Sequence, residues 1–295
     1  MKVLSLFDGI SCGMVALERA GIQVEKYVAY EIDEDAIKVS KHNYPQIIHK
    51  GDVFKAEYTE GEYDLLIGGS PCTHWSIARG GNNRETEASG VGFDLFMQYV
   101  RALEEVKPKY FLYENNESMS DAIKNEITKR LGVEPITINS ADFSAQSRKR
   151  YYWTNIPVNL DYEKSNLVFK DIEYKHNYTI GDFSVYADTM RIAQDGSGVR
   201  WDTGGKGWYS QQNRARSIDY KMTTVTTKAV NKIYLGDYKY RSVHPIEYER
   251  LQTLPDNYTD CLSSKTKRVK CVGNGWTVDV IAHLLSGLKD DGYSN

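Results

Sequence analysis

The residues of this chain best suited to chemistry are a cysteine and a glutamate that each follow an apolar run. Pro71 and Cys72 close the run YDLLIGGSPC at residues 63–72, and Glu114 follows the run YFLY at residues 110–113. Open α/β sheets bind ligands at the carboxyl edge of their strands. If the two strands are neighbours, a thiol and a carboxylate meet over one pocket, as covalent attack on an electron-poor ring requires. The alternative is that Cys72 is a small buried apolar residue and Glu114 a surface acid.

A glycine-containing turn near the N-terminus favours nucleoside binding. The run FDGISCG at residues 7–13 separates the first predicted strand from the first predicted helix, where backbone amides can accept a ligand. Glu31 closes the second strand, a position from which an acid grips ribose hydroxyls. Asp52, after the third strand, could accept a hydrogen bond from an adenine amino group. The alternative is a tight turn with two solvated acids. The fingerprint G-x-G-x-x-G is absent, which disfavours a nucleotide-dependent dehydrogenase.

The basic run QSRKR at residues 146–150 is a second candidate binding element. If Arg148 and Arg150 alternate along a strand, both side chains point to the same face. Two guanidinium forks could then hold a base carbonyl, a carboxylate or a phosphate. The alternative is an ordinary basic strand edge.

The elements that must position these residues alternate between strands and helices over the first 155 residues. Strands are predicted at residues 2–7, 26–30, 46–49, 63–67, 109–113, 135–139 and 148–155. Helices are predicted at residues 13–20, 33–43 and 95–106, and later at 245–254 and 278–288. This alternation predicts a parallel sheet covered by helices on both faces.

The pattern changes after residue 155, where strands become short and glycine clusters appear at residues 195–198 and 204–207. We expect a catalytic and cofactor-binding domain at residues 1–155, completed by 272–295, and a small, loop-rich, mostly β domain at 156–271. Residues 146–241 carry a balance of +6 and the remainder −9, within a net charge of −3. A positive region on a negative body suits a polyanion, although a solvated surface with chance asymmetry is equally compatible.

The amino-acid composition limits which classes of protein this chain can belong to. With 295 residues and 41% hydrophobic residues, the chain can build a proper core. Its four cysteines have no CxxC pairing, which favours reduced thiols in a cytosolic protein over a zinc site or a disulfide scaffold. No apolar run approaches about 20 residues, so no membrane span is expected, and the start lacks the features of a signal peptide.

Taken in order, these motifs closely resemble those of the cytosine-5 DNA methyltransferases. Two further runs, HPIEYERLQTLPDNY at residues 244–258 and GNGWTVDVIAHLL at 273–285, complete the resemblance. The N-terminal half looks most like the animal de novo branch, and the compact size looks like that of bacterial or phage modification enzymes. The resemblance implies a Rossmann-like, S-adenosylmethionine-dependent methyltransferase sheet with helices on both faces, and a small target-recognition domain. It also implies a cytoplasmic, nucleoid-associated protein of bacterial or phage origin.

The resemblance implies methyl transfer from S-adenosylmethionine to carbon 5 of cytosine in a short specific sequence of double-stranded DNA. The base would be flipped out of the helix and attacked by Cys72, with Pro71 shaping the turn. Glu114 would contact ring nitrogen 3 and the exocyclic amine, while Arg148 and Arg150 would hold the base carbonyl and organise the site. The residues implied to line the cofactor pocket are Phe7, Asp8, Gly9, Glu31, Ile32, Asp52, Val53, Ser70 and Asn274.

DNA contacts are expected from two regions. The loop at residues 73–92 contains several glycines and is long enough to close over the base. Its phosphate-contact candidates are Ser76, Arg79 and Arg84. The glycine-rich loops of the second domain carry side chains of the types that read base edges. The candidates are Arg200, Lys206, Gln211, Gln212 and Arg214, of which Gln211 would also fill the gap left by the flipped base.

Three positions depart from the family pattern without removing a reacting group. Asn116 stands where a valine is usual, Ser11 where many relatives have glycine, and Gly275-Trp276 where a small residue and a valine are usual. A transfer-RNA cytosine-5 methyltransferase of the same fold stays open as an alternative. An inactive DNA-binding homologue is disfavoured by the reacting residues already named. The resemblance further implies a monomer without a metal, with a restriction endonuclease as a candidate functional partner.

Overall fold

The computed structural model describes residues 1–71, 75, 84–203 and 214–291, which fall into two compact units. The first unit comprises Met1–Asn139, Lys149–Tyr162 and Val278–Asn295. The second comprises Ser140–Arg148 and Glu163–Thr277. The boundaries between the units therefore differ from the expected boundaries at residues 155 and 271. A short segment, residues 140–148, belongs to the second unit although it precedes the main part of that unit in the sequence.

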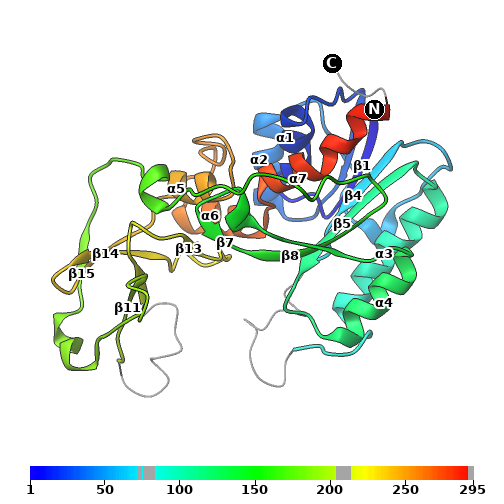
Figure 1. Cartoon of the computed structure of the whole chain (residues 1–295). Helices are drawn as coiled ribbons and strands as arrows, with labels where there is room; N and C mark the ends of the chain where they lie inside the picture. The colour runs from blue at the N-terminus through cyan, green and yellow to red at the C-terminus, as the bar shows by residue number, and fades with distance from the viewer. Residues whose placement is uncertain (72–74, 76–83, 204–213, 292–295) are drawn as a thin grey trace. The chain divides into compact units, whose positions relative to one another are not determined.

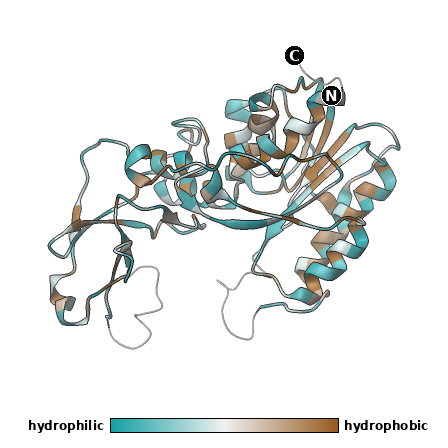
Figure 2. Cartoon of the chain, in the orientation of Figure 1, coloured by the Kyte–Doolittle hydropathy of each residue, from teal (hydrophilic) through white to brown (hydrophobic). Residues whose placement is uncertain are grey.

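A seven-stranded sheet is the centre of the first unit (Figure 1), with the order β3-β2-β1-β4-β5-β8-β6. Its strands are β1 Lys2–Leu6, β2 Lys26–Tyr30, β3 Ile48–His49, β4 Leu65–Gly68, β5 Tyr110–Asn116, β6 Ile136–Asn139 and β8 Lys149–Thr154. Neighbours from β3 to β5 are parallel, whereas β8 is antiparallel to both β5 and β6. All four residues of β4 are buried, as expected for a strand covered on both faces. Figure 2 shows the apolar character of the central strands.

Helices cover both faces of this sheet (Figure 1). They are α1 Cys12–Arg19, α2 Glu34–Asn43, α3 Val91–Val106, α4 Asp121–Leu131 and α7 Val278–Leu285. From β1 the chain moves outward through α1 and β2, and from β4 it moves the opposite way through α3 and β5. Because such crossovers are right-handed, the two directions place their helices on opposite faces. Helix α7 joins the face of α1, where Arg19 contacts Asp279 at 2.5 Å.

The second unit is built on a six-stranded sheet with the order β10-β11-β12-β14-β15-β9. Its strands are β9 Ile180–Asp182, β10 Arg191–Ile192, β11 Gly198–Arg200, β12 Arg214–Arg216, β14 Lys232–Gly236 and β15 Lys239–Ser242. A separate parallel pair joins β7 Gln146–Ser147 to β13 Met222–Thr223. Two helices follow, α5 Pro245–Leu251 and α6 Lys265–Asn274. The short, mostly β character of this part of the chain agrees with the sequence prediction.

Short 3₁₀ helices complete the described elements: η1 Val53–Lys55, η5 Ser140–Asp142, η6 Phe169–Ile172, η7 Ser184–Thr189 and η10 Ser286–Asp291. A buried ion pair ties three elements of the second unit together. Arg241 of β15 is fully buried and binds both carboxylate oxygens of Glu247 at 2.8 and 2.9 Å, and Glu173 at 3.0 Å. Because Glu247 also caps α5 through the amide of His244, this pair fixes the start of the run HPIEYERL.

Candidate active site

The strands that carry the predicted cysteine and glutamate are direct neighbours. β4 and β5 pair in parallel, with Gly68 opposite Tyr113. The chain beyond β4 and the residue Glu114 therefore emerge at the same edge of the first unit, as the sequence predicts. Pro71 is exposed there. Cys72 itself lies outside the described residues, as do Ser76, Arg79, Lys206, Gln211 and Gln212.

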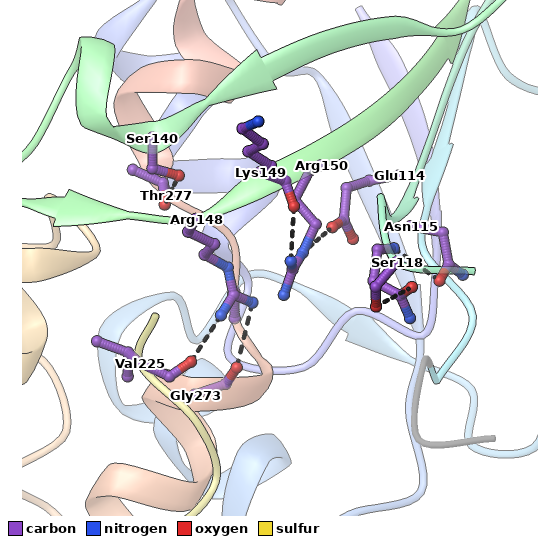
Figure 3. A network of polar contacts seen from close by, with 12 residues as sticks. Glu114, Asn115, Ser118, Ser140, Arg148, Lys149, Arg150, Val225, Gly273 and Thr277 are labelled. Atoms are coloured by element: carbon purple, nitrogen blue, oxygen red, sulfur yellow. Dashed lines mark hydrogen bonds and ion pairs between the residues drawn. The ribbon is translucent and has the colours of Figure 1, made fainter. Parts of the chain in front are cut away.

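Glu114 forms an ion pair with Arg150 at this edge (Figure 3). Arg150 Nε lies 2.9 Å from Glu114 Oε1, and each side chain is only 12–13% exposed. Glu114 pairs across the sheet with Tyr152, so Arg150, two residues away on β8, is its diagonal neighbour on the same face. The guanidinium also donates to the Lys149 carbonyl at 2.8 Å. The expectation that Glu114 follows the end of its strand is wrong, because β5 continues to Asn116 through its pairing with β8.

A buried network fixes the segment before Pro71 against β5. Asn115 Nδ2 donates to the Ser70 carbonyl and to the Tyr113 hydroxyl, both at 3.1 Å. The hydroxyls of Ser70 and Tyr113 lie 2.6 Å apart. Burial raises the pKa of the Tyr113 hydroxyl above its ordinary value, so it stays protonated and can donate. Asn115 and Tyr113 were not among the predicted site residues, although Asn115 follows Glu114 in the ENN run.

Arg84, predicted to contact phosphates, donates to backbone carbonyls of its own chain, and its phosphate contact stays a prediction. Its Nε donates to the Trp75 carbonyl at 3.0 Å, and its terminal nitrogen donates to the Ser118 carbonyl. Trp75 is fully buried among the aromatic and aliphatic side chains of the first unit's core. These contacts favour a role for Arg84 in anchoring its own segment beside the end of β5.

Glu31 rigidifies the turn at residues 7–13, which lies between β1 and α1. One carboxylate oxygen accepts the amide of Gly9 at 2.8 Å, and the other accepts the amides of Ile32 and Asp33 at 2.7 and 2.8 Å. Phe7 and Ser11, with φ of 57° and 60°, lie in the left-handed region together with Gly9. A bulky residue such as Phe7 rarely adopts this conformation, and strained backbone of this kind clusters at ligand sites.

Asp8 is partly buried, and its carboxylate is surrounded by hydroxyl groups. Its oxygens accept from Ser5 at 2.6 Å, Tyr27 at 2.7 Å and Ser11 at 2.5 Å. Burial nonetheless raises the pKa of Asp8 to about 6, and the nearby charge of Glu31 adds to this shift. These contacts hold Asp8 within the turn, and its role in cofactor binding stays a prediction.

Asp52 and its neighbours form the third part of this edge. Asp52 caps η1 by accepting the amide of Phe54 at 3.0 Å. Val53 is buried, whereas Ile32 and Phe54 are 72% and 53% exposed. Phe54 was not predicted, and its signal in the sequence is an aromatic residue two positions after a loop acid.

Arg148 and Asn274 belong to the second unit. Arg148 is 6% exposed and donates to the carbonyls of Val225 at 2.7 Å and of Gly273 and Gly275 at 3.2 Å (Figure 3). It thereby holds the GNG turn around Asn274, which is exposed at the end of α6. The prediction that Arg148 and Arg150 alternate along one strand is wrong, because β8 begins only at Lys149.

Among the described residues, no helix is long and apolar enough to cross a membrane, and no cluster of histidine, cysteine and carboxylate side chains could hold a metal. Among the described residues, Cys12, Cys261 and Cys271 form no disulfide bond.

Comparison with solved structures shows the fold. The Entamoeba histolytica methyltransferase EhMeth superposes with a TM-score of 0.73 and 16% identity, covering 99% of this chain and 98% of that one. The S. pombe Dnmt2 methyltransferase gives a TM-score of 0.67 with 15% identity, covering 99% of each chain.

Comparison with curated proteins finds phage and bacterial methyltransferases. The orphan methyltransferase M.SPRI of Bacillus phage SPR is 34% identical over 175 residues, which are 54% of this chain but only 38% of that protein. The match to M.Rho11sI of Bacillus phage rho11s likewise spans 32% of its length. The type II methyltransferase M.NgoPII of Neisseria gonorrhoeae is 26% identical, over 98% of this chain and 95% of that protein. The family model for C-5 cytosine-specific DNA methylases matches residues 1–290. The chain therefore belongs to the C-5 cytosine-specific DNA methylase family.

Proposed function

We propose that this protein transfers a methyl group from S-adenosylmethionine to carbon 5 of cytosine in a short specific sequence of double-stranded DNA. The observation that carries the proposal is the nearly buried Glu114–Arg150 pair, whose glutamate lies on β5, beside the strand β4 that leads to Pro71 and Cys72. A carboxylate held in this way can meet a ring nitrogen and an amine, which is what activation of cytosine requires. Family membership supports the reaction type.

The residues at the carboxyl edge of the sheet fit the cofactor. Glu31 is held rigid by three amides at the end of β2, where an acid can bind ribose hydroxyls. The exposed side chains of Ile32 and Phe54 offer apolar surface for an adenine ring, and Asp52 lies between them in sequence. Phe7, Gly9 and Ser70 are the other candidates from this unit. Asn274, which belongs to the second unit, is a candidate from the family resemblance alone. S-adenosylmethionine, when bound, supplies an electrophilic methyl group on a sulfonium.

The protein residues supply the activation of cytosine. Carbon 5 is a poor nucleophile until the Cys72 thiolate adds its electron pair to carbon 6. Nitrogen 3 takes up a proton that it shares with the Glu114 carboxyl group, which neutralises the charge displaced onto the ring, while the same carboxyl group accepts a hydrogen bond from the exocyclic amine. Carbon 5 then takes the methyl group, and loss of its proton restores the double bond and expels the Cys72 thiolate. The base must leave the duplex to reach this edge, which costs a few kcal/mol in unstacking.

DNA is the proposed substrate because the nearly full-length relatives, including M.NgoPII, are named as type II methyltransferases. Transfer RNA is the competing substrate of the same chemistry. The deciding experiment incubates purified protein with labelled S-adenosylmethionine and either double-stranded DNA or transfer RNA, and then maps 5-methylcytosine by sequencing. We expect label in DNA at one short sequence. Label confined to transfer RNA would replace the DNA assignment, and label in neither would reject the activity.

A further inference from the structure

Three arginines of the second unit stand in one row across neighbouring strands. In β10, β11 and β12, Arg191 pairs with Arg200, and Arg200 pairs with Arg214. All three side chains are exposed. Residues paired in this way across antiparallel strands point to the same face of a sheet. The row therefore presents three guanidinium groups from strands that are about 4.8 Å apart.

The next residues along the strands fix which face the row occupies. Val199 pairs with Ala215, and both are buried in the aromatic cluster of the unit. There Phe183 and Trp201 stack with ring centroids 4.1 Å apart. Because side chains alternate along a strand, the arginines face away from this cluster. The aromatic cluster thus provides a packed support for the two strands beneath the row.

The row lines a cavity of about 630 Å³ whose charged groups are almost all positive. Besides the three arginines, its cations are Arg216 and Lys232, and Asp195 is the one carboxylate among its described lining residues. Arg216 is held in place, donating to Ser197 Oγ at 2.8 Å and to the Lys221 carbonyl at 3.1 Å.

We propose that the arginine row, Arg191, Arg200 and Arg214, binds successive phosphates of a DNA backbone and carries no sequence information. This inference rests on the proposed function, since it takes DNA as the partner. Each DNA strand carries one negative charge per about 3.4 Å of helix axis, so a duplex offers a repeated anion to long, flexible side chains on adjacent strands. Arginines that read bases pair with guanines, so three in one row would specify only a run of guanines. Contacts to successive phosphates place no such restriction on the DNA sequence.

The test measures binding to a fluorescent duplex of randomised sequence at several salt concentrations, without cofactor. Each arginine is replaced by alanine and by lysine, as in Arg191→Ala and Arg191→Lys. Lys239→Ala is the matched control, since it removes one exposed positive charge from β15 of the same unit, outside the row. Thermal unfolding of every variant checks that the fold is retained.

Each alanine variant should weaken binding uniformly across sequences and reduce the slope of log K against log salt by about 0.9. Lysine should largely restore both, because a phosphate accepts a point charge, whereas bidentate base reading requires the guanidinium fork. An unchanged slope, or loss of preference at one base pair that lysine fails to restore, would overturn the proposal, as would a wild-type protein that does not bind duplex. Because no methyl transfer is measured, an inactive protein that binds as expected rejects only the proposed reaction.

Discussion

At the scale of single residues, the raised pKa of Asp8 predicts how the free energy of unfolding changes with pH, and this can be measured without substrate. Burial raises its pKa in the folded protein to about 6, above the value near 3.9 of an unfolded chain. The folded state thus binds the proton more tightly, so this stabilising contribution is complete below about pH 4 and is lost as pH rises towards 6 and above. The Asp8→Asn variant has no carboxyl group to titrate at this position, so it does not lose stability in this way as pH rises. Its unfolding free energy, relative to wild type, should rise by on the order of 2 kcal/mol between pH 4 and 7.

Chemical denaturation of both proteins at several pH values measures this difference. The groups that face Asp8 are the hydroxyls of Ser5, Ser11 and Tyr27 and the charge of Glu31, and all are retained in the variant. A difference in unfolding free energy that stays constant across this range would show that Asp8 is ionised at acidic pH. The buried environment inferred for its carboxylate would then be incorrect.

Cys72 carries the covalent step of the proposed mechanism. Cys72→Ser should abolish methyl transfer while leaving S-adenosylmethionine binding nearly unchanged, because the cofactor candidates of the first unit other than Ser70 lie at the ends of other strands. Labelled methyl transfer and calorimetric titration measure the two properties. DNA that contains 5-fluorocytosine at the target should trap an adduct, since fluorine cannot leave as a cation. A peptide map that places the adduct on Cys12, Cys261 or Cys271 would identify a different nucleophile.

At the scale of elements, the pairing of β5 with β8 decides the environment of the catalytic candidates. The antiparallel strand brings Arg150 diagonally next to Glu114 and keeps both side chains nearly buried. Glu114→Gln preserves the shape of the side chain but removes its charge. We expect methyl transfer to fall by about 10²–10⁴-fold, the range for a positioned acid–base group. Single-turnover transfer measures the effect, with Glu117→Gln, in the turn after β5, as the control.

The same pair can be tested for joint action. If Arg150 acts through Glu114, adding Arg150→Ala to Glu114→Gln should reduce transfer little beyond the Glu114→Gln variant alone. Multiplied losses in the double variant would instead assign the two residues independent roles. Near-normal transfer by Glu114→Gln would remove Glu114 from the mechanism altogether.

The elements that the sequence predicts well are those that are largely buried and therefore consist mainly of apolar residues. β4 is a continuous apolar run and β2 is one after Lys26, so the existence of both strands follows from the pattern alone. Helices α4 and α6 were missed because most of their residues are polar. Only Ile123, Ile127 and Leu131 of α4 are buried, each four residues from the next. The end of β5 was misplaced because its polar residues are held by cross-strand pairing with β8, which no local pattern records.

Prediction of the site residues likewise relies on local features of the sequence and fails for contacts between distant residues. Glu31, Glu114 and Arg150 could be named as candidates because their residue types and strand positions are local features of the sequence, and their roles stay predictions. The internal role of Arg148 depends on carbonyls contributed by Val225, Gly273 and Gly275, far along the chain. The support of Pro71 by Asn115 likewise depends on the register between β4 and β5. Such contacts become visible only once the pairing of strands is known.

At the scale of the whole molecule, the chain enters each unit more than once. It leaves the first unit at Asn139, returns for Lys149–Tyr162, and returns again at Val278. The last segment supplies α7, which contacts α1 next to the predicted cofactor turn. Both ends of the second unit's main segment are therefore tethered to the sheet. A family match that runs from residue 1 to 290 is consistent with this interleaved arrangement.

This division of the chain separates two contributions to DNA recognition that a single assay can resolve. Arg200 and Arg214 belong to the proposed phosphate row, whereas Lys206 and Gln211 lie between them, outside the described residues. We expect Arg200→Ala to lower methylation of a randomised DNA library evenly. Gln211→Ala should instead relax preference at one base position, because loss of a base contact costs about 1–3 kcal/mol at that position alone. Sequencing the methylated library measures both effects. If Gln211→Ala also lowers methylation evenly, base reading must come from another segment, and the charge asymmetry of residues 146–241 would serve affinity alone.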